Sequence, residues 1–331
     1  MERFALAAAV VLGFALTAAL CSLFVPLRRV LERREQNQQP AQSEQPRPAP
    51  LRAPLWGGLC AAAGTVAAVG VGWLAACVGQ PELLGSEGRL MTRLLTALAG
   101  SLAFGAVGLA EDLARMRSPA ALGLRRDVRL LLEALAAAFV LLLLRAAGCL
   151  PRGLGVPGAG YVLLGSAVPF LWAVLMVVLA ECARIAERDE GTVCGAAFVA
   201  MLALMMAEAG LGVPGLAVLP GALAGALVAL GLWAFPPARL GVGCCGSLLA
   251  AGAIGCIPLS LDMTSLTVPL ALPFWAAGGL LAAQLLGAKH TGKPLRCWVK
   301  KHKMSPETVF LCSFALSAVG YVLALALLRW C

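Results

Sequence analysis

The stretch ECARIAERDEG, Glu181 to Gly191, decides how this chain is organised. It places four acids and two arginines in eleven residues, between apolar runs at 159–180 and 192–210. Only 13% of the 331 residues are charged, so this group lies either on a solvated hinge or in a polar site at a membrane surface. A second acidic group, in GLAEDLARMR (108–117), ends another apolar run. Together the two groups predict an acidic cleft on the inner side of a membrane.

The composition predicts an integral membrane protein. Apolar residues make up 60% of the chain and the mean hydropathy is +0.88, whereas soluble domains are roughly 50% apolar. A spanning helix needs about 20 mostly apolar residues. The chain supplies about ten such runs, at 4–27, 56–77, 94–110, 130–147, 159–180, 192–210, 213–234, 243–260, 267–287 and 308–328. We therefore expect an all-α fold with about ten transmembrane helices, in a single polytopic membrane domain over residues 1–331.

The basic residues predict the orientation, because lysine and arginine stay on the cytoplasmic side. With both termini outside, 20 of the 26 lysines and arginines lie inside. This orientation makes the acidic face cytoplasmic, along with a polar, proline-rich loop at 28–55 and a basic loop at 288–307. The sequence LRRVLERRE after the first run favours an uncleaved span over a signal peptide. The net charge of +9 then reflects topology and attraction to anionic lipids, and no nucleic-acid partner is expected.

Individual charged residues allow two interpretations. Glu111 and Asp112 could be solvated at a helix end, but charges at bilayer depth are costly and mark function. Glu187 and Glu190 are three residues apart and share a face if helical; alternatively, they belong to salt bridges on a solvated loop. Arg125, Arg126 and Arg129 at the inner boundary are expected to anchor the next span by snorkelling.

The inner-face motifs, taken in order, resemble a known family. GLAEDLARMR (108–117) resembles Gly-Phe-x-Asp-Asp-x-x-Lys, and ECARIAERDEG (181–191) resembles Asn-Ala-x-Asn-Leu-Thr-Asp-Gly-x-Asp-Gly. PARLGVGCCGSLLAAG (237–252) resembles Pro-Ala-x-x-Phe-Met-Gly-Asp-x-Gly-Ser-Leu-Ala-Leu-Gly, and TGKPLRCWV (291–299) resembles Thr-Gly-Lys-Arg followed by Pro-x-His-His-His. These are motifs of the polyprenyl-phosphate phosphoglycosyltransferases, glycosyltransferase family 4, and are most similar to those of its phospho-N-acetylmuramoyl-pentapeptide transferases.

The resemblance implies a reaction and its partners. The family transfers a phospho-sugar, such as phospho-N-acetylmuramoyl-pentapeptide, from a UDP-sugar to undecaprenyl phosphate and releases UMP. It does so with Mg²⁺ in cell-wall precursor synthesis. The resemblance thus implies an enzyme in the bacterial plasma membrane, surrounded by the bilayer, and it allows a homodimer. It further implies these site residues: catalytic Glu111, Asp112, Glu187 and Glu190, of which Asp112 and Glu190 would hold the metal, and substrate-binding Gly191, Lys293 and Arg296.

Departures from the motifs leave two functions open. Cys244 stands where the family has a metal-binding aspartate, and Arg296, Cys297 and Trp298 stand at its histidine cluster. Mg²⁺ prefers hard oxygen ligands, which a neutral thiol does not supply. The chain is therefore either an active phosphoglycosyltransferase or a catalytically degenerate paralogue that acts as a membrane scaffold or lipid-binding protein.

Overall fold

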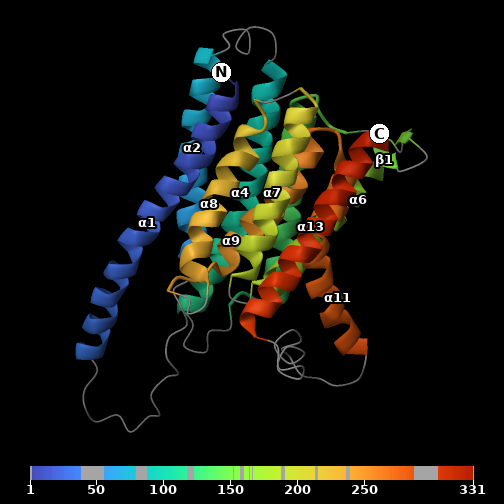
Figure 1. The fold of residues 1–331 in the computed structure, drawn as a ribbon. Helices are drawn as coiled ribbons and strands as arrows, with labels where there is room; N and C mark the ends of the chain where they lie inside the picture. Colours follow the sequence, from blue (N-terminus) through green and yellow to red (C-terminus); the bar gives the residue numbers. More distant parts are fainter. Residues whose placement is uncertain are drawn as a thin grey trace.

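The fold is built around α9 (Gly243–Ser260), a helix whose residues are all buried. In the computed structural model, α9 is surrounded by α2 (Gly57–Gly79), α4 (Gly88–Arg117), α6 (Ala167–Ala186) and α7 (Thr192–Gly210), each of which packs against it. Figure 1 shows α9 within the bundle of long helices. Helix α9 is built of small and apolar residues, which allow its neighbours to approach closely on every side.

The outer helices complete the bundle. The structure describes residues 2–38, 56–79, 88–117, 123–151, 153–156, 160–163, 165, 167–187, 191–212, 215–235, 239–286 and 305–330. The remaining elements are α1 (Glu2–Gln38), α5 (Arg126–Ala146), α8 (Val218–Ala234), η1 (Thr264–Leu266), α10 (Thr267–Leu270), α11 (Leu272–Leu286) and α13 (Pro306–Trp330).

The marked N- and C-termini lie at the same end of the bundle (Figure 1). We call the opposite end, where α4 and α6 end and α5, α7 and α9 begin, the site end.

Each of the ten predicted apolar runs overlaps a described helix, in order α1, α2, α4, α5, α6, α7, α8, α9, α11 and α13. Seven of the described helices are long and apolar enough to cross a membrane. Helices α8 and α11 are shorter, with 17 and 15 residues, and α5 carries Arg129, Glu133 and Arg145 along its length. The expectation of a helical membrane protein is confirmed. The count of ten spans and their orientation stay predictions.

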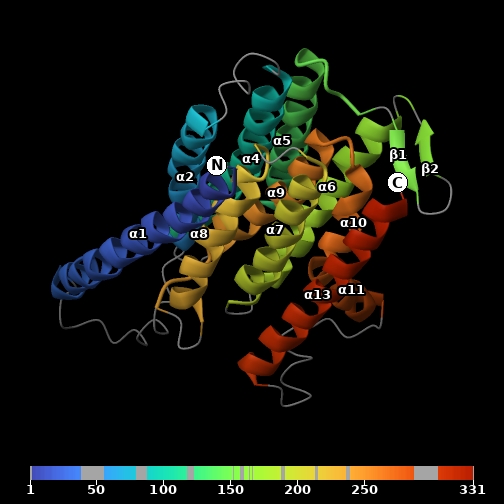
Figure 2. The same cartoon turned by 45° about the horizontal axis from the view of Figure 1, so that its top comes forward.

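The structure corrects the all-α expectation at one place. Strands β1 (Gly153–Val156) and β2 (Gly160–Leu163) form an antiparallel hairpin, so the fifth helix begins at Ala167 and not at 159. Glycine-rich sequence disfavours a helix here and suits a tight reversal of the chain. The hairpin lies at the edge of the molecule beside α6 (Figure 2). The loop predicted at 28–55 also begins later, because α1 continues to Gln38.

Glycines set the distance between α9 and its neighbours. A Cβ atom added at Gly108 of α4 would overlap the carbonyl group of Cys244, and one at Gly58 of α2 would overlap the backbone of Gly246. Such close backbone contact is typical of packed membrane helices. Because Asp112 lies one helical turn after Gly108 on the same face, this contact brings the Asp112 carboxylate to the start of α9.

We expect Gly108→Ala to lower the midpoint of thermal unfolding of the detergent-purified protein, because overpacking typically costs about 1–3 kcal/mol. Gly70→Ala in α2 is the matched control, since nothing lies within 4 Å of the site of its added Cβ. Alanine forms helices better than glycine by roughly 1 kcal/mol, so Gly70→Ala is expected to be neutral or stabilising. Equal shifts for the two variants would contradict the close α4–α9 contact.

Candidate functional site

Asp112 caps the start of α9 from another helix. Its Oδ1 accepts a hydrogen bond from the backbone N–H of Cys244 at 3.0 Å, and its Oδ2 accepts one from that of Cys245 at 2.9 Å. The first N–H groups of a helix lack partners within the helix and carry partial positive charge. Gly243 begins α9 with φ of +71°, a left-handed conformation that glycine adopts without strain. The carboxylate of Asp112 is buried, at 1% exposure, and both of its oxygens are used.

Arg115 lies among three carboxylates at the site end. Its Nη2 donates to Glu111 Oε1 at 2.7 Å, and its Nη1 lies 3.7 Å from Glu187 Oε2 and 3.9 Å from Asp112 Oδ1. The Arg115 side chain is 20% exposed, whereas that of Glu111 is 3% exposed. Cys244 borders the group, because its thiol donates to Glu187 Oε2 at 3.9 Å. The arginine thus joins acids from α4 to one just after α6.

Two further arginines extend this network between α5 and α6. Arg129 Nε and Arg184 Nη2 each donate to Glu181, to Oε1 and Oε2 respectively, at 2.6 Å. Arg129 Nη1 also lies 3.7 Å from Glu111 Oε1. We call these seven residues the acid–arginine cluster: Glu111, Asp112, Arg115, Arg129, Glu181, Arg184 and Glu187. Its four acids and three arginines leave one net negative charge when all are ionised.

Glu133 of α5 lies behind the cluster. It is fully buried, at 0% exposure, and within electrostatic range of Glu181, Arg129 and Arg184. Neither carboxyl oxygen of Glu133 has a hydrogen-bond partner among the described residues. This residue adds an acid to a region that is already close to charge balance.

The structure brings part of the predicted site together. Glu111, Asp112 and Glu187 converge around Arg115 next to Cys244. Gly191 caps the start of α7 with φ of +78°. Helix α6 ends at Ala186, so Glu187 lies in the turn that follows it. The other predicted residues, Glu190, Lys293 and Arg296, lie outside the residues that the structure describes.

Sequence reasoning missed the roles of the arginines. Snorkelling was the wrong interpretation for Arg129, which is 7% exposed and paired with Glu181, whereas Arg125 and Arg126 are exposed as expected. Arg115 and Glu181 were visible in the sequence only as members of charged stretches. Their available signal was that each lies on an apolar helix near a side chain of opposite charge, which favours pairing over solvation.

The described donor set does not fit Mg²⁺. This ion demands near-octahedral oxygen ligands, but both Asp112 oxygens are bonded to backbone N–H groups, and Cys244 offers a thiol. No group of three or more metal-binding side chains occurs among the residues described. A divalent ion about 4 Å from Arg115 would be repelled by roughly 8 kcal/mol at an effective dielectric constant of about 20.

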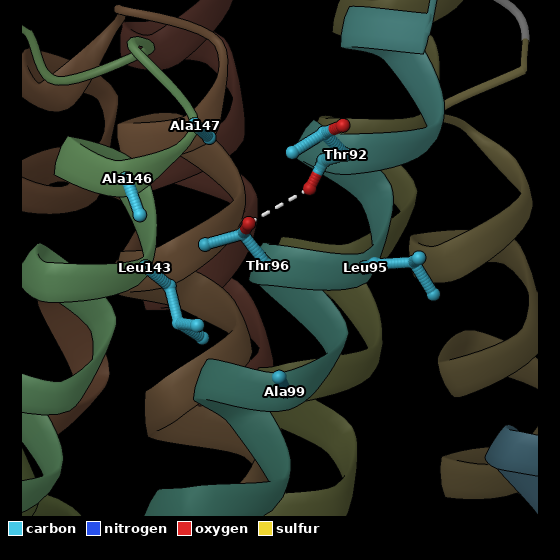
Figure 3. A pocket seen from close by; sticks show the side chains of 7 residues that line it. All are labelled: Thr92, Leu95, Thr96, Ala99, Leu143, Ala146 and Ala147. Carbon is cyan, nitrogen blue, oxygen red and sulfur yellow. Dashed lines mark hydrogen bonds between the residues drawn. The ribbon is translucent and has the colours of Figure 1, made fainter.

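A separate groove lies between α4 and α5 at the other end of the bundle. Its volume is about 430 Å³, and it is lined mainly by apolar side chains such as Leu95 and Leu143. Figure 3 shows that the hydroxyl of Thr96 donates to the backbone oxygen of Thr92, at 2.7 Å, so it is engaged within α4. No charged side chain lines this groove. It therefore lacks what a phosphate site requires.

The fold and the polar cluster define a helical membrane protein with charged groups gathered at one end of the bundle. A family model described as "Glycosyl transferase family 4" matches residues 94–262, slightly more than half of the chain. The matched segment contains all seven residues of the acid–arginine cluster. This chain belongs to glycosyl transferase family 4, the family of the polyprenyl-phosphate phosphoglycosyltransferases. No curated protein matches the chain.

We expect Asp112→Asn to lower the thermal unfolding midpoint. Asparagine lacks the negative charge and turns one acceptor into an N–H₂ group that faces a backbone N–H, and an unsatisfied buried group costs about 1–3 kcal/mol. Asp127→Asn is the matched control, because Asp127 is an exposed acid in the first turn of α5. Unchanged midpoints for both variants would contradict the cap on α9.

Proposed function

We propose that this protein transfers a phospho-sugar from a UDP-sugar to undecaprenyl phosphate, with release of UMP, in the bacterial plasma membrane. The proposed sugar is N-acetylmuramoyl-pentapeptide, as in cell-wall precursor synthesis, and the proposed face is cytoplasmic. One observation carries the proposal: within the segment that matches the family model, acids and an arginine from α4 and from the turn after α6 meet at the start of α9.

The chemistry of the transfer explains why charged groups are needed at this place. An oxygen of the lipid phosphate forms a bond to the phosphorus that carries the sugar, and the bond from that phosphorus to the UMP oxygen breaks. Two polyanions must therefore approach each other, and fixed positive charge lowers the cost of that approach. The lipid phosphate is ionised at neutral pH and needs at most help with a second proton.

We assign different tasks to the residues of the cluster. Arg115 and Glu187 are assigned to the ligand side, because both are partly exposed and Glu187 contacts Cys244 at the start of α9. Glu111 orients Arg115 through their 2.7 Å ion pair. Asp112 is a positioning residue, because both of its oxygens hold the start of α9. Glu190, Gly191, Lys293 and Arg296 are proposed, by resemblance, for the nucleotide and pyrophosphate.

A second candidate function is a catalytically degenerate relative that binds the lipid phosphate without transferring to it. Two observations favour it: Cys244 offers a neutral thiol beside Glu187, and Arg115 holds the acids that would otherwise face a substrate. This candidate shares the lipid ligand with the first. The two candidates differ only in whether UMP is released.

The test is UMP release by the purified protein in detergent with undecaprenyl phosphate and UDP-N-acetylmuramoyl-pentapeptide. Glu187→Gln is the comparison variant. It removes a charge near the ligand side and keeps an oxygen that can accept a hydrogen bond from the Cys244 thiol. We expect the wild type to release UMP and the variant to be slower by about 10²-fold, as for loss of one electrostatic contact in an active site.

Equal release by the wild type and Glu187→Gln would remove Glu187 from the site, and wild-type release no greater than that of a reaction without protein would sink the transferase proposal. The degenerate candidate then predicts that undecaprenyl phosphate, but not undecaprenol, raises the thermal unfolding midpoint. Undecaprenol has the same hydrocarbon chain and lacks the phosphate, so it isolates the charged group. Equal effects of the two lipids, without UMP release, would refute both candidates.

A further inference from the structure

Arg115 occupies the place that a bound cation would take in this cluster. Its guanidinium lies 2.7 Å from Glu111, 3.7 Å from Glu187 and 3.9 Å from Asp112. These carboxylates come from two segments of the chain, so the arginine holds the segments together as a bridging ion would. Its Nη1 makes only the two longer contacts among the described residues, which leaves its hydrogens able to meet an anionic ligand.

Arginine meets these acids through two separate nitrogens, whereas lysine has only one. The family motif quoted above has lysine at this position, which carries a single point charge. Arginine presents a planar fork with donors on two separate nitrogens, and here one Nη faces Glu111 while the other faces Glu187 and Asp112. The exchange of lysine for arginine therefore lets one side chain reach all three acids.

The neighbouring cysteine reduces the negative charge that a cation must balance. The Cys244 thiol donates a hydrogen bond to Glu187. An aspartate at position 244, as in the family motif, would instead add a further carboxylate. With three acids around Arg115 and Arg129 close to Glu111, the cluster is near charge balance without any bound ion. The exchange of lysine for arginine leaves the charge unchanged and adds a second donor nitrogen, whereas cysteine in place of aspartate removes one negative charge.

We propose that Arg115 is a built-in cation that replaces a divalent metal, so that this pocket meets its phosphate ligand without one. The proposal rests on the proposed function for the nature of the ligand, a phosphate. Its independence from divalent metal rests on the geometry of the cluster alone. It predicts a metal-free wild type and a latent metal site that appears when Arg115 loses its charge.

The test is binding of Mn²⁺, a paramagnetic probe of Mg²⁺ sites, measured by electron paramagnetic resonance on the purified full chain. We expect no stoichiometric Mn²⁺ binding by the wild type, and the same unfolding midpoint in EDTA and in MgCl₂. Arg115→Met is expected to bind about one Mn²⁺ per chain and to be stabilised by MgCl₂ relative to EDTA, because Glu111 and Glu187 lose their shared partner and such ions bind through one or two carboxylates and water. Arg117→Met is the matched control, an exposed arginine two residues on in α4 that has no ion pair with a described residue.

Two results would overturn the proposal: stoichiometric Mn²⁺ binding by the wild type that Glu187→Gln abolishes, or a folded Arg115→Met that binds no more Mn²⁺ than Arg117→Met. If Arg115→Met does not fold, Arg115→Gln takes its place, since its amide can still donate to Glu111. The outcome is separable from the proposed function. Absence of UMP release would refute the transfer and leave the Mn²⁺ result standing, while UMP release that requires Mg²⁺ would confirm the transfer and refute the built-in cation.

Discussion

The structure depends on the two hydrogen bonds that the Asp112 carboxylate accepts from the backbone N–H groups of Cys244 and Cys245, in the first turn of α9. Helix α9 is buried along its whole length, so its unpaired N–H groups cannot be left to water and must find partners within the protein. Asp112 provides them from α4, because Gly108 lets α4 approach α9 at the carbonyl of Cys244. The same contact sets the position of Glu111 and Arg115, and hence of the acid–arginine cluster.

Charge balance connects this contact to function. An isolated ion in a helical bundle is costly, and a buried pair that loses one partner costs about 3–5 kcal/mol. The cluster meets this constraint with three arginines against four acids, all linked by distances of 3.9 Å or less. A membrane protein that handles phosphate must also present positive charge to its ligand. Arg115 satisfies both demands because it is paired and still 20% exposed.

Much of the fold could be predicted from the sequence, because long apolar runs in lipid have few alternatives to the helix. The exception, the hairpin of β1 and β2, lies in a glycine-rich stretch that counting apolar residues cannot distinguish from a helix. The convergence of Glu111, Asp112 and Glu187 follows the order of the motifs. The sequence could not predict which residues pair. Arg129 and Glu181 are 52 residues apart in the chain. Asp112 accepts hydrogen bonds from the backbone of α9, which is within reach only because α4 and α9 pack closely.

The most direct test of the central claim is a cross-link between the segment after α6 and the start of α9. In a Glu187→Cys variant treated with a short thiol-specific cross-linker, mass spectrometry of the digested protein should find the peptides containing positions 187 and 244 joined, because Glu187 Oε2 lies 3.9 Å from Cys244 Sγ. Ala209→Cys, at the far end of α7, should not join Cys244. Linkage of position 209 to Cys244, or none from position 187, would contradict the gathering of these segments at one end of the bundle.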